Sequence, residues 1–97
     1  HAEIVLIRKA YKILHKNYYL NGYSVVQNSE PCSMCMSLMV KAKIDIVYFG
    51  TKMDKGNDPL ISAKEIADRS KHKINVVCGI LEKECRKSIS EVRDFEF

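Results

Sequence analysis

Apolar positions recur along the chain with helical spacing in four stretches and with strand spacing in three. Residues 2–15 are apolar around most of the helix circumference at the start and along one stripe toward the end. This pattern predicts a helix whose first turns are packed deeply between other elements. The remaining elements are shorter: strands are predicted over 23–27, 44–50 and 74–78, and helices over 32–42, 60–70 and 80–92.

Prolines and cap-forming side chains mark the expected starts of two helices. Pro31 lies where its missing N–H costs no helical hydrogen bond. Asp58 and Pro59 are predicted as the N-cap and the first residue of the helix over 60–70. The expected buried side chains are Met34, Leu38, Met39 and Ala42 in the helix over 32–42, and Leu81, Cys85, Ile89 and Val92 in the last helix.

Helices and strands alternate from one end of the chain to the other. Such alternation predicts an α/β layer fold with a largely parallel sheet. The chain opens directly in its most apolar helix, with no capping residue before it. We therefore expect elements upstream of His1 to be missing from this sequence. We also expect an exposed apolar face on the helix over 2–15, which would demand a partner.

The 97 residues suit a single domain. With 46% hydrophobic and 29% charged residues, the composition is that of a globular protein and excludes disorder along the whole chain. The net charge of +4 is spread along the sequence, so it permits a nucleic-acid partner without requiring one. No leader peptide and no membrane-spanning apolar stretch is visible, which predicts a cytoplasmic protein.

The cysteines fall into two groups. In a cytoplasmic chain, a close pair such as Cys32 and Cys35 indicates metal binding or redox chemistry rather than a structural disulfide. Cys78 and Cys85 are expected to be small buried apolar residues. The basic cluster at 71–73 is a candidate for contact with nucleic-acid phosphates.

His1, Glu3, Cys32 and Cys35 are the residues with the clearest chemistry. Cys32 and Cys35 can face one point from the first turn of a helix, whose N-terminus favours thiolates. With the imidazole of His1 they make three zinc ligands and leave the fourth tetrahedral position open for water, as in catalytic zinc sites. Zinc lowers the pKa of such a water, and Glu3 is expected to be the catalytic residue that takes its proton.

Other interpretations of these residues stay open. A C-x-x-C pair also occurs as half of a structural zinc site or as a thiol redox pair. A histidine at position 1 can also be the remnant of an affinity tag. Neither alternative explains why Glu3 and Pro31 accompany the three ligands.

These motifs resemble those of the cytidine deaminase-like superfamily, in which H-x-E is followed by P-C-x-x-C. The segments HAEIVLIRKA, SEPCSMCMSLMVKAKIDIVYFGT and HKINVVCGILEKECRKSI are similar to the branch of tRNA adenosine deaminases, guanine deaminases and related nucleoside deaminases. Glu30 before Pro31 and the segment GILEKEC carry the resemblance to purine-acting members.

The resemblance implies a three-layer α/β/α sandwich with a central mixed, largely parallel sheet, and a homodimer. Family members begin with a helix and a β-hairpin before H-A-E. Residues 1–97 are therefore expected to be one zinc-binding catalytic domain that is N-terminally incomplete. The implied roles are one Zn²⁺ per subunit on His1, Cys32 and Cys35, with Glu3 catalytic. Substrate binding is expected from Ser29, Glu30 and Pro31.

The expected function is that of a zinc-dependent hydrolytic deaminase that releases ammonia from a nucleobase or nucleoside. A purine is favoured, either adenosine in tRNA or a guanine- or adenine-type base. One alternative is a pyrimidine (cytosine or cytidine) deaminase. Another is a catalytically inactive deaminase-like zinc module used for binding or assembly. The presence of Glu3 argues against the inactive module, which needs no proton shuttle.

Overall fold

The computed structural model describes residues 1–14, 19–52 and 61–91. Over these residues the elements follow one another in the predicted order, and no helix is both long and apolar enough to cross a bilayer. The helices are α1 (Ala2–Ile13), α2 (Ser33–Lys41), α3 (Ala63–Arg69) and α4 (Glu82–Glu91), and the strands are β1 (Ser24–Ser29), β2 (Ile46–Thr51) and β3 (Asn75–Val77).

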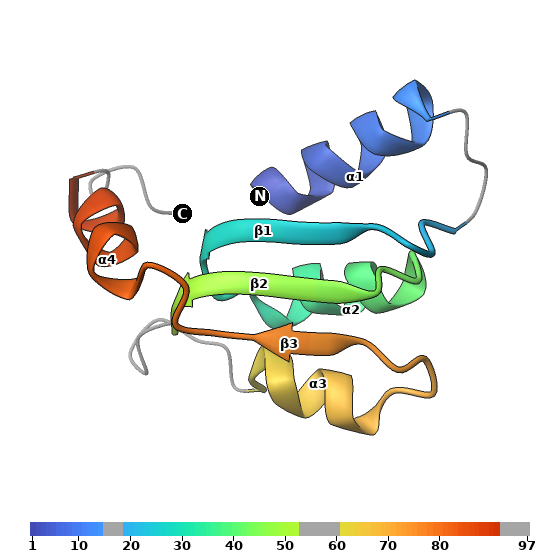
Figure 1. Ribbon diagram of the computed structural model, residues 1–97. Helices are drawn as coiled ribbons and strands as arrows, with labels where there is room; N and C mark the ends of the chain where they lie inside the picture. The colour runs from blue at the N-terminus through green and yellow to red at the C-terminus, as the bar shows by residue number, and fades with distance from the viewer. Residues whose placement is uncertain (15–18, 53–60, 92–97) are drawn as a thin grey trace.

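The three strands form one parallel sheet in the order β1-β2-β3 (Figure 1). The register aligns Val25 with Val47 and Val26 with Tyr48. Because side chains alternate along a strand, Val25, Val47 and Phe49 lie on one face, and Val26 and Tyr48 lie on the other. Parallel strands also end at the same edge of the sheet, and at this edge the chain passes from β1 into α2.

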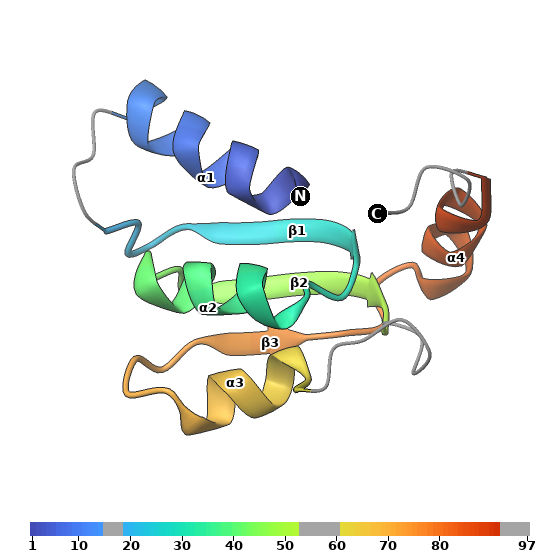
Figure 2. The ribbon, with the colours of Figure 1, turned by 180° about the vertical axis from the view of Figure 1, so that it is seen from behind.

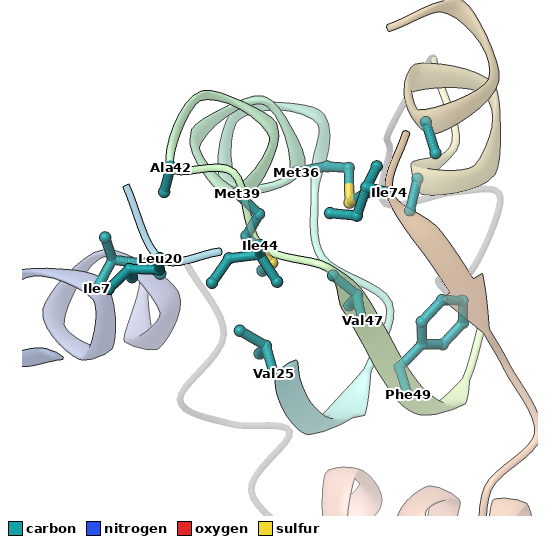
Figure 3. Packing of buried hydrophobic residues seen from close by; sticks show 12 residues of the cluster. Ile7, Leu20, Val25, Met36, Met39, Ala42, Ile44, Val47, Phe49 and Ile74 are labelled. Carbon is teal, nitrogen blue, oxygen red and sulfur yellow. The ribbon is translucent and has the colours of Figure 1, made fainter. Parts of the chain in front are cut away.

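Helices α2 and α3 cover the face that carries Val25 and Val47, and α1 runs along the outer edge of β1 (Figures 1 and 2). Met36 and Met39 of α2 are fully buried and pack over Val25 and Val47 (Figure 3). Burial of this apolar surface is the main favourable contribution to folding. The core consists of Ile7, Leu20, Val25, Met36, Met39, Ala42, Ile44, Val47, Phe49, Ala63, Ala67 and Ile74.

Helix α4 packs against the opposite face of the sheet, at the carboxyl end of β2. Gly50 lies on that face, where an added Cβ would collide with the Cys85 sulfur and lie 2.7 Å from the Ile80 carbonyl oxygen. The α/β prediction is therefore confirmed, with α4 as the third layer over one end of the sheet. Helix α4 leaves the rest of that face open, since Val26 on the same face is 71% exposed. The described sheet is wholly parallel, so the implied mixed sheet is not seen in this part of the chain.

Gly50→Ala is expected to destabilise the protein by about 1–3 kcal/mol, because the methyl group must displace Ile80 and Cys85. Chemical denaturation measures the loss. Gly22→Ala is unsuitable as a control because Gly22 has a φ of +87°. Ser24→Ala, at an exposed position of β1, is expected to change stability by less than about 0.5 kcal/mol. Equal losses in both variants would contradict this account of α4 packing.

Helix α1 is less buried than its sequence predicts. Only Ile7 of this helix is buried, with Ala10 and Tyr11 partly buried on the same stripe. Val5 and Leu6 are 50% and 48% exposed. The prediction of deeply packed first turns is therefore wrong, whereas the predicted exposed apolar face is present. The cause is the position of α1 at the sheet edge, where it has neighbours on one side.

Several expected side-chain positions differ in the structure. Met34 is 52% exposed because α2 turns Cys35 and Met36 inward instead. Leu81 is 68% exposed, with a positive φ of 47°, because it lies in the turn before α4. Cys78 is also exposed, contrary to the prediction, while Cys85 is half-buried.

Ser62, not Asp58, caps α3: its side chain accepts a hydrogen bond from the Glu65 N–H at 3.2 Å, and the helix begins at Ala63. Asp58, Pro59 and Val92 lie outside the described residues.

Candidate metal centre and its surroundings

The starts of α1 and α2 meet at the carboxyl end of the sheet. His1 immediately precedes α1, Cys32 is the N-cap of α2, and Cys35 lies in the first turn of α2. Pro31 fixes the extended entry into α2, and Cys32 keeps an extended backbone with φ −68° and ψ 169°. The fold thus brings together ligands that are more than thirty residues apart in the sequence.

The spacing of these three side chains matches a tetrahedral zinc site. The His1 Nδ1 atom lies 3.6 Å from the Cys32 Sγ atom and 3.5 Å from the Cys35 Sγ atom. All three ligand atoms lie within 4.8 Å of one another. Zn–N and Zn–S bonds of ordinary length at a tetrahedral angle separate the N and S atoms by about 3.6 Å. The donor set and its spacing therefore fit zinc with three protein ligands.

Burial and neighbouring negative charge both act on the Cys35 thiol of the cluster. Burial raises the pKa of the Cys35 thiol to about 12, with further contributions from the charge of Glu3 and from Cys32. At neutral pH this thiol therefore stays protonated in the protein alone. A divalent cation reverses this effect, because metal coordination stabilises the thiolate directly.

The Glu3 carboxylate lies beside the cluster and is held by β1. The Gln27 Nε2 group donates hydrogen bonds to Glu3 Oε2 at 3.0 Å and to the Ser29 carbonyl oxygen at 2.7 Å. The charge of Glu3 contributes to the raised pKa of the Cys35 thiol, so it acts on the metal-ligand cluster. Glu3 is half-buried.

The three predicted substrate-binding residues occupy different environments. Ser29 is half-buried at the end of β1, whereas Pro31 is buried. Glu30 is only 7% exposed, and its Oε2 atom accepts a hydrogen bond from the Ala63 N–H at 2.9 Å. The Glu30 carboxylate thus joins the metal-bearing segment to the start of α3, where a negative charge is favoured.

Glu30→Ala is expected to destabilise the fold by about 1–3 kcal/mol, because it leaves the buried Ala63 N–H without its acceptor. Thermal or urea denaturation measures the change. The matched control is Glu65→Ala, which changes an exposed glutamate of α3. Its expected effect on stability is below about 0.5 kcal/mol. A Glu30 variant as stable as the control would show that this hydrogen bond contributes nothing.

A known protein family matches the part of the chain that holds these residues. The family described as "Cytidine and deoxycytidylate deaminase zinc-binding region" matches residues 1–51, a span that holds His1, Glu3, Cys32 and Cys35. The chain belongs to this deaminase family. Zinc is the metal that the family binds, and the ligand set of the structure agrees with it.

The relatives of this deaminase-family chain confirm the resemblance inferred from its sequence. It is 34% identical to the tRNA-specific adenosine deaminase of Bacillus subtilis (strain 168), over 93% of this chain and 56% of the relative. A chain from structural studies of A-to-I editing by tRNA:A34 deaminases at the wobble position superposes with a TM-score of 0.72 and 28% identity, over 90% of this chain and 63% of that one. The chain thus spans little more than half the length of such relatives.

The family also includes a mouse relative described as a probable inactive tRNA-specific adenosine deaminase-like protein 3. Identity to this protein is 31%, over 72% of this chain and 20% of the relative. Family membership therefore does not by itself establish activity, which depends on the residues around the metal ligands.

The sequence interpretation did not identify Gln27 as part of this site. A signal is present, since strand alternation places Gln27 on the inward face with Val25, where a polar side chain needs a partner. The pattern does not show which partner that is, because Glu3 lies 24 residues away.

Proposed function

We propose that this chain is the zinc-binding catalytic domain of a hydrolytic deaminase that releases ammonia from a purine, with adenosine in tRNA as the first candidate. The observation that carries this proposal is the arrangement of Glu3 beside a His1, Cys32 and Cys35 cluster of zinc dimensions. Support for the substrate comes from relatives described as tRNA-specific adenosine deaminases.

In this proposal His1, Cys32 and Cys35 hold the metal, and Glu3 moves protons. Bound zinc supplies Lewis acidity that lowers the pKa of a water at the open position. Glu3 takes one proton from the attacking water and delivers it to the ring nitrogen of the substrate. It then takes the second proton from the same oxygen and delivers it to the amino group, which leaves as ammonia when the C–N bond breaks. Ser29 contributes to the surface that contacts the substrate. Glu30 and Pro31 are buried and support this surface from the protein interior.

The alternatives differ in substrate and in activity. A guanine- or adenine-type base and a pyrimidine would use the same Glu3 and metal ligands, so the site chemistry does not separate them. An inactive zinc module would keep the ligands but would not need Glu3 held beside Cys35. Assembly as a homodimer and a cytoplasmic location belong to the same proposal.

The deciding experiment measures ammonia release and product formation by the zinc-loaded protein. The panel consists of a tRNA with adenosine at the wobble position, free adenosine, adenine, guanine, cytidine and cytosine. We expect inosine to form in tRNA, with no turnover after zinc is removed by a chelator. Turnover of cytidine or cytosine alone would overturn the purine assignment. Zinc binding without turnover of any substrate would support the inactive module.

A further inference from the structure

The side-chain amide of Gln27 has one determined orientation. Its Nε2 group donates to two oxygens, Glu3 Oε2 and the Ser29 carbonyl. Reversing the amide would place the Gln27 oxygen against both acceptors, so the hydrogen-bond network excludes the flipped rotamer. Gln27 therefore links the carboxylate of Glu3 to the end of β1 through a defined pair of hydrogen bonds.

This arrangement carries a cost in stability. The Oε1 atom of Gln27 is buried and has no hydrogen-bond partner among the described residues. Such an atom loses its contact with water and gains nothing in return. An apolar side chain at this inward-facing position would avoid the penalty. A buried polar atom without a hydrogen-bond partner is unfavourable, and natural proteins tolerate such atoms mainly at functional sites. This atom lies beside the proposed catalytic residue, so function is the expected reason for it.

We propose that Gln27 is a positioning residue that fixes the Glu3 carboxylate relative to the metal ligands. The proposal rests on the proposed function, since it assigns Gln27 a role through Glu3. The hydrogen bond to Oε2 restrains that oxygen and leaves the other carboxylate oxygen of Glu3 to exchange protons with substrate. Without the bond, the side chain of Glu3 rotates among its staggered conformations, and productive encounters become rarer.

Gln27→Leu tests this role because it keeps the bulk of the side chain and removes both hydrogen bonds. We expect kcat to fall about 10- to 100-fold with KM unchanged, the range seen when residues supporting an active-site group are replaced. Zinc content should stay at one per chain, and the melting temperature should stay the same or rise. The matched control is Asn28→Leu, an exposed neighbour on the same strand that should leave kcat within about twofold.

Repeating the Gln27→Leu change in a Glu3→Asp protein distinguishes a positioning role from a general loss of structure. In Glu3→Asp the carboxylate is one methylene shorter and cannot keep the same bond to Gln27. Adding Gln27→Leu there should lower kcat by less than about threefold. Equal losses in both backgrounds, or a lower melting temperature with unchanged kcat, would overturn the proposal. If no substrate is turned over, the proposed function fails separately. Crystal structures of zinc-loaded wild type and Gln27→Leu then still decide the matter, since an unmoved Glu3 in the variant contradicts positioning.

A second, independent observation concerns a hollow of about 690 Å³ at the far end of α2 from Cys32. Lys41, Lys43 and Lys71 line it together with the rings of Tyr11 and Tyr19. No carboxylate is among its lining residues, and the two ion pairs found in the described part of the chain lie elsewhere. The Lys43 Nζ atom lies 5.6 Å from the centre of the Tyr19 ring.

We infer that this hollow binds the sugar-phosphate backbone of an RNA. Three ammonium groups, with no carboxylate among the described residues that line the hollow, concentrate positive charge where phosphates can reach it. Aromatic rings beside lysines add a surface typical of sites for unpaired nucleotides. The inference extends the RNA substrate of the proposed function to a second contact, at the opposite end of α2 from the metal ligands.

The test compares two triple variants with equal charge changes by fluorescence anisotropy of a labelled RNA stem-loop. Lys41→Glu, Lys43→Glu and Lys71→Glu together should weaken binding at least about 10-fold and lower the slope of log affinity against log salt by about 2–3. Lys9→Glu, Lys83→Glu and Lys87→Glu, all at exposed positions on α1 and α4, should do neither. Equal weakening by both triples would overturn the inference. So would displacement of the RNA by millimolar inorganic phosphate, because it would indicate a site for a small anion. Binding is measured without turnover, so this outcome is independent of deamination.

Discussion

Glu3→Gln is expected to lower kcat by about 10²- to 10⁴-fold, the range that a positioned proton-transfer group contributes. The amide has nearly the shape of the carboxylate but cannot accept a proton at neutral pH. It can still accept the hydrogen bond that Gln27 donates to Glu3 Oε2, so the local geometry should persist. Ammonia release at saturating substrate gives kcat, and metal analysis shows whether zinc is retained.

The matched control for this change is Glu65→Gln, an exposed glutamate on α3 that is expected to leave kcat within about twofold. Retained zinc together with a large loss of kcat assigns Glu3 to the reaction rather than to the metal. A Glu3→Gln protein that keeps more than a third of wild-type kcat would contradict the proposed mechanism. Loss of zinc would instead show that Glu3 acts through the metal site.

The sequence predicted the order of elements and the metal cluster for physical reasons that can be stated. Alternating helical and strand spacing requires parallel strands to share a carboxyl edge, and helices that follow them begin there. Cys32 is the N-cap of such a helix and Cys35 lies in its first turn, so their side chains had to face this edge. His1 was placed with them by its chemistry, because two thiols alone leave a zinc site without a third ligand.

The parts that sequence could not predict depend on neighbours far along the chain. Helical spacing identifies the apolar stripe of α1 but does not show that α1 lies at an edge, where Val5 and Leu6 stay half exposed. Asp58 and Ser62 are equally good cap residues by type, and the bond from Ala63 to Glu30 helps to set where α3 begins. The contact of Gln27 with Glu3 is not visible in the sequence, because it forms only when the chain folds and β1 lies next to the first turn of α1.

Cys35→Ser is expected to reduce bound zinc from one ion per chain to less than about 0.1, and to lower the melting temperature by more than about 10 °C relative to the zinc-loaded protein. A ligand present at a thousandfold excess over its dissociation constant stabilises a fold by about 4 kcal/mol. Each kcal/mol moves the melting temperature of a domain this small by about 4–8 °C. Serine nearly fills the space of the fully buried cysteine, so lost packing accounts for little of the change.

The control for Cys35→Ser is Cys78→Ser, which alters an exposed cysteine and should leave zinc content and melting temperature unchanged. A chelator provides the second comparison, since it should lower the melting temperature of wild type to that of Cys35→Ser and have no effect on the variant. A thiol redox pair makes the opposite prediction, namely a zinc-free wild type whose Cys32 and Cys35 form a disulfide under mild oxidation. The two outcomes exclude each other, because a thiolate that ligates zinc is not available for the disulfide. One measurement of zinc and free thiols in the purified wild type therefore decides between a metal centre and a redox pair.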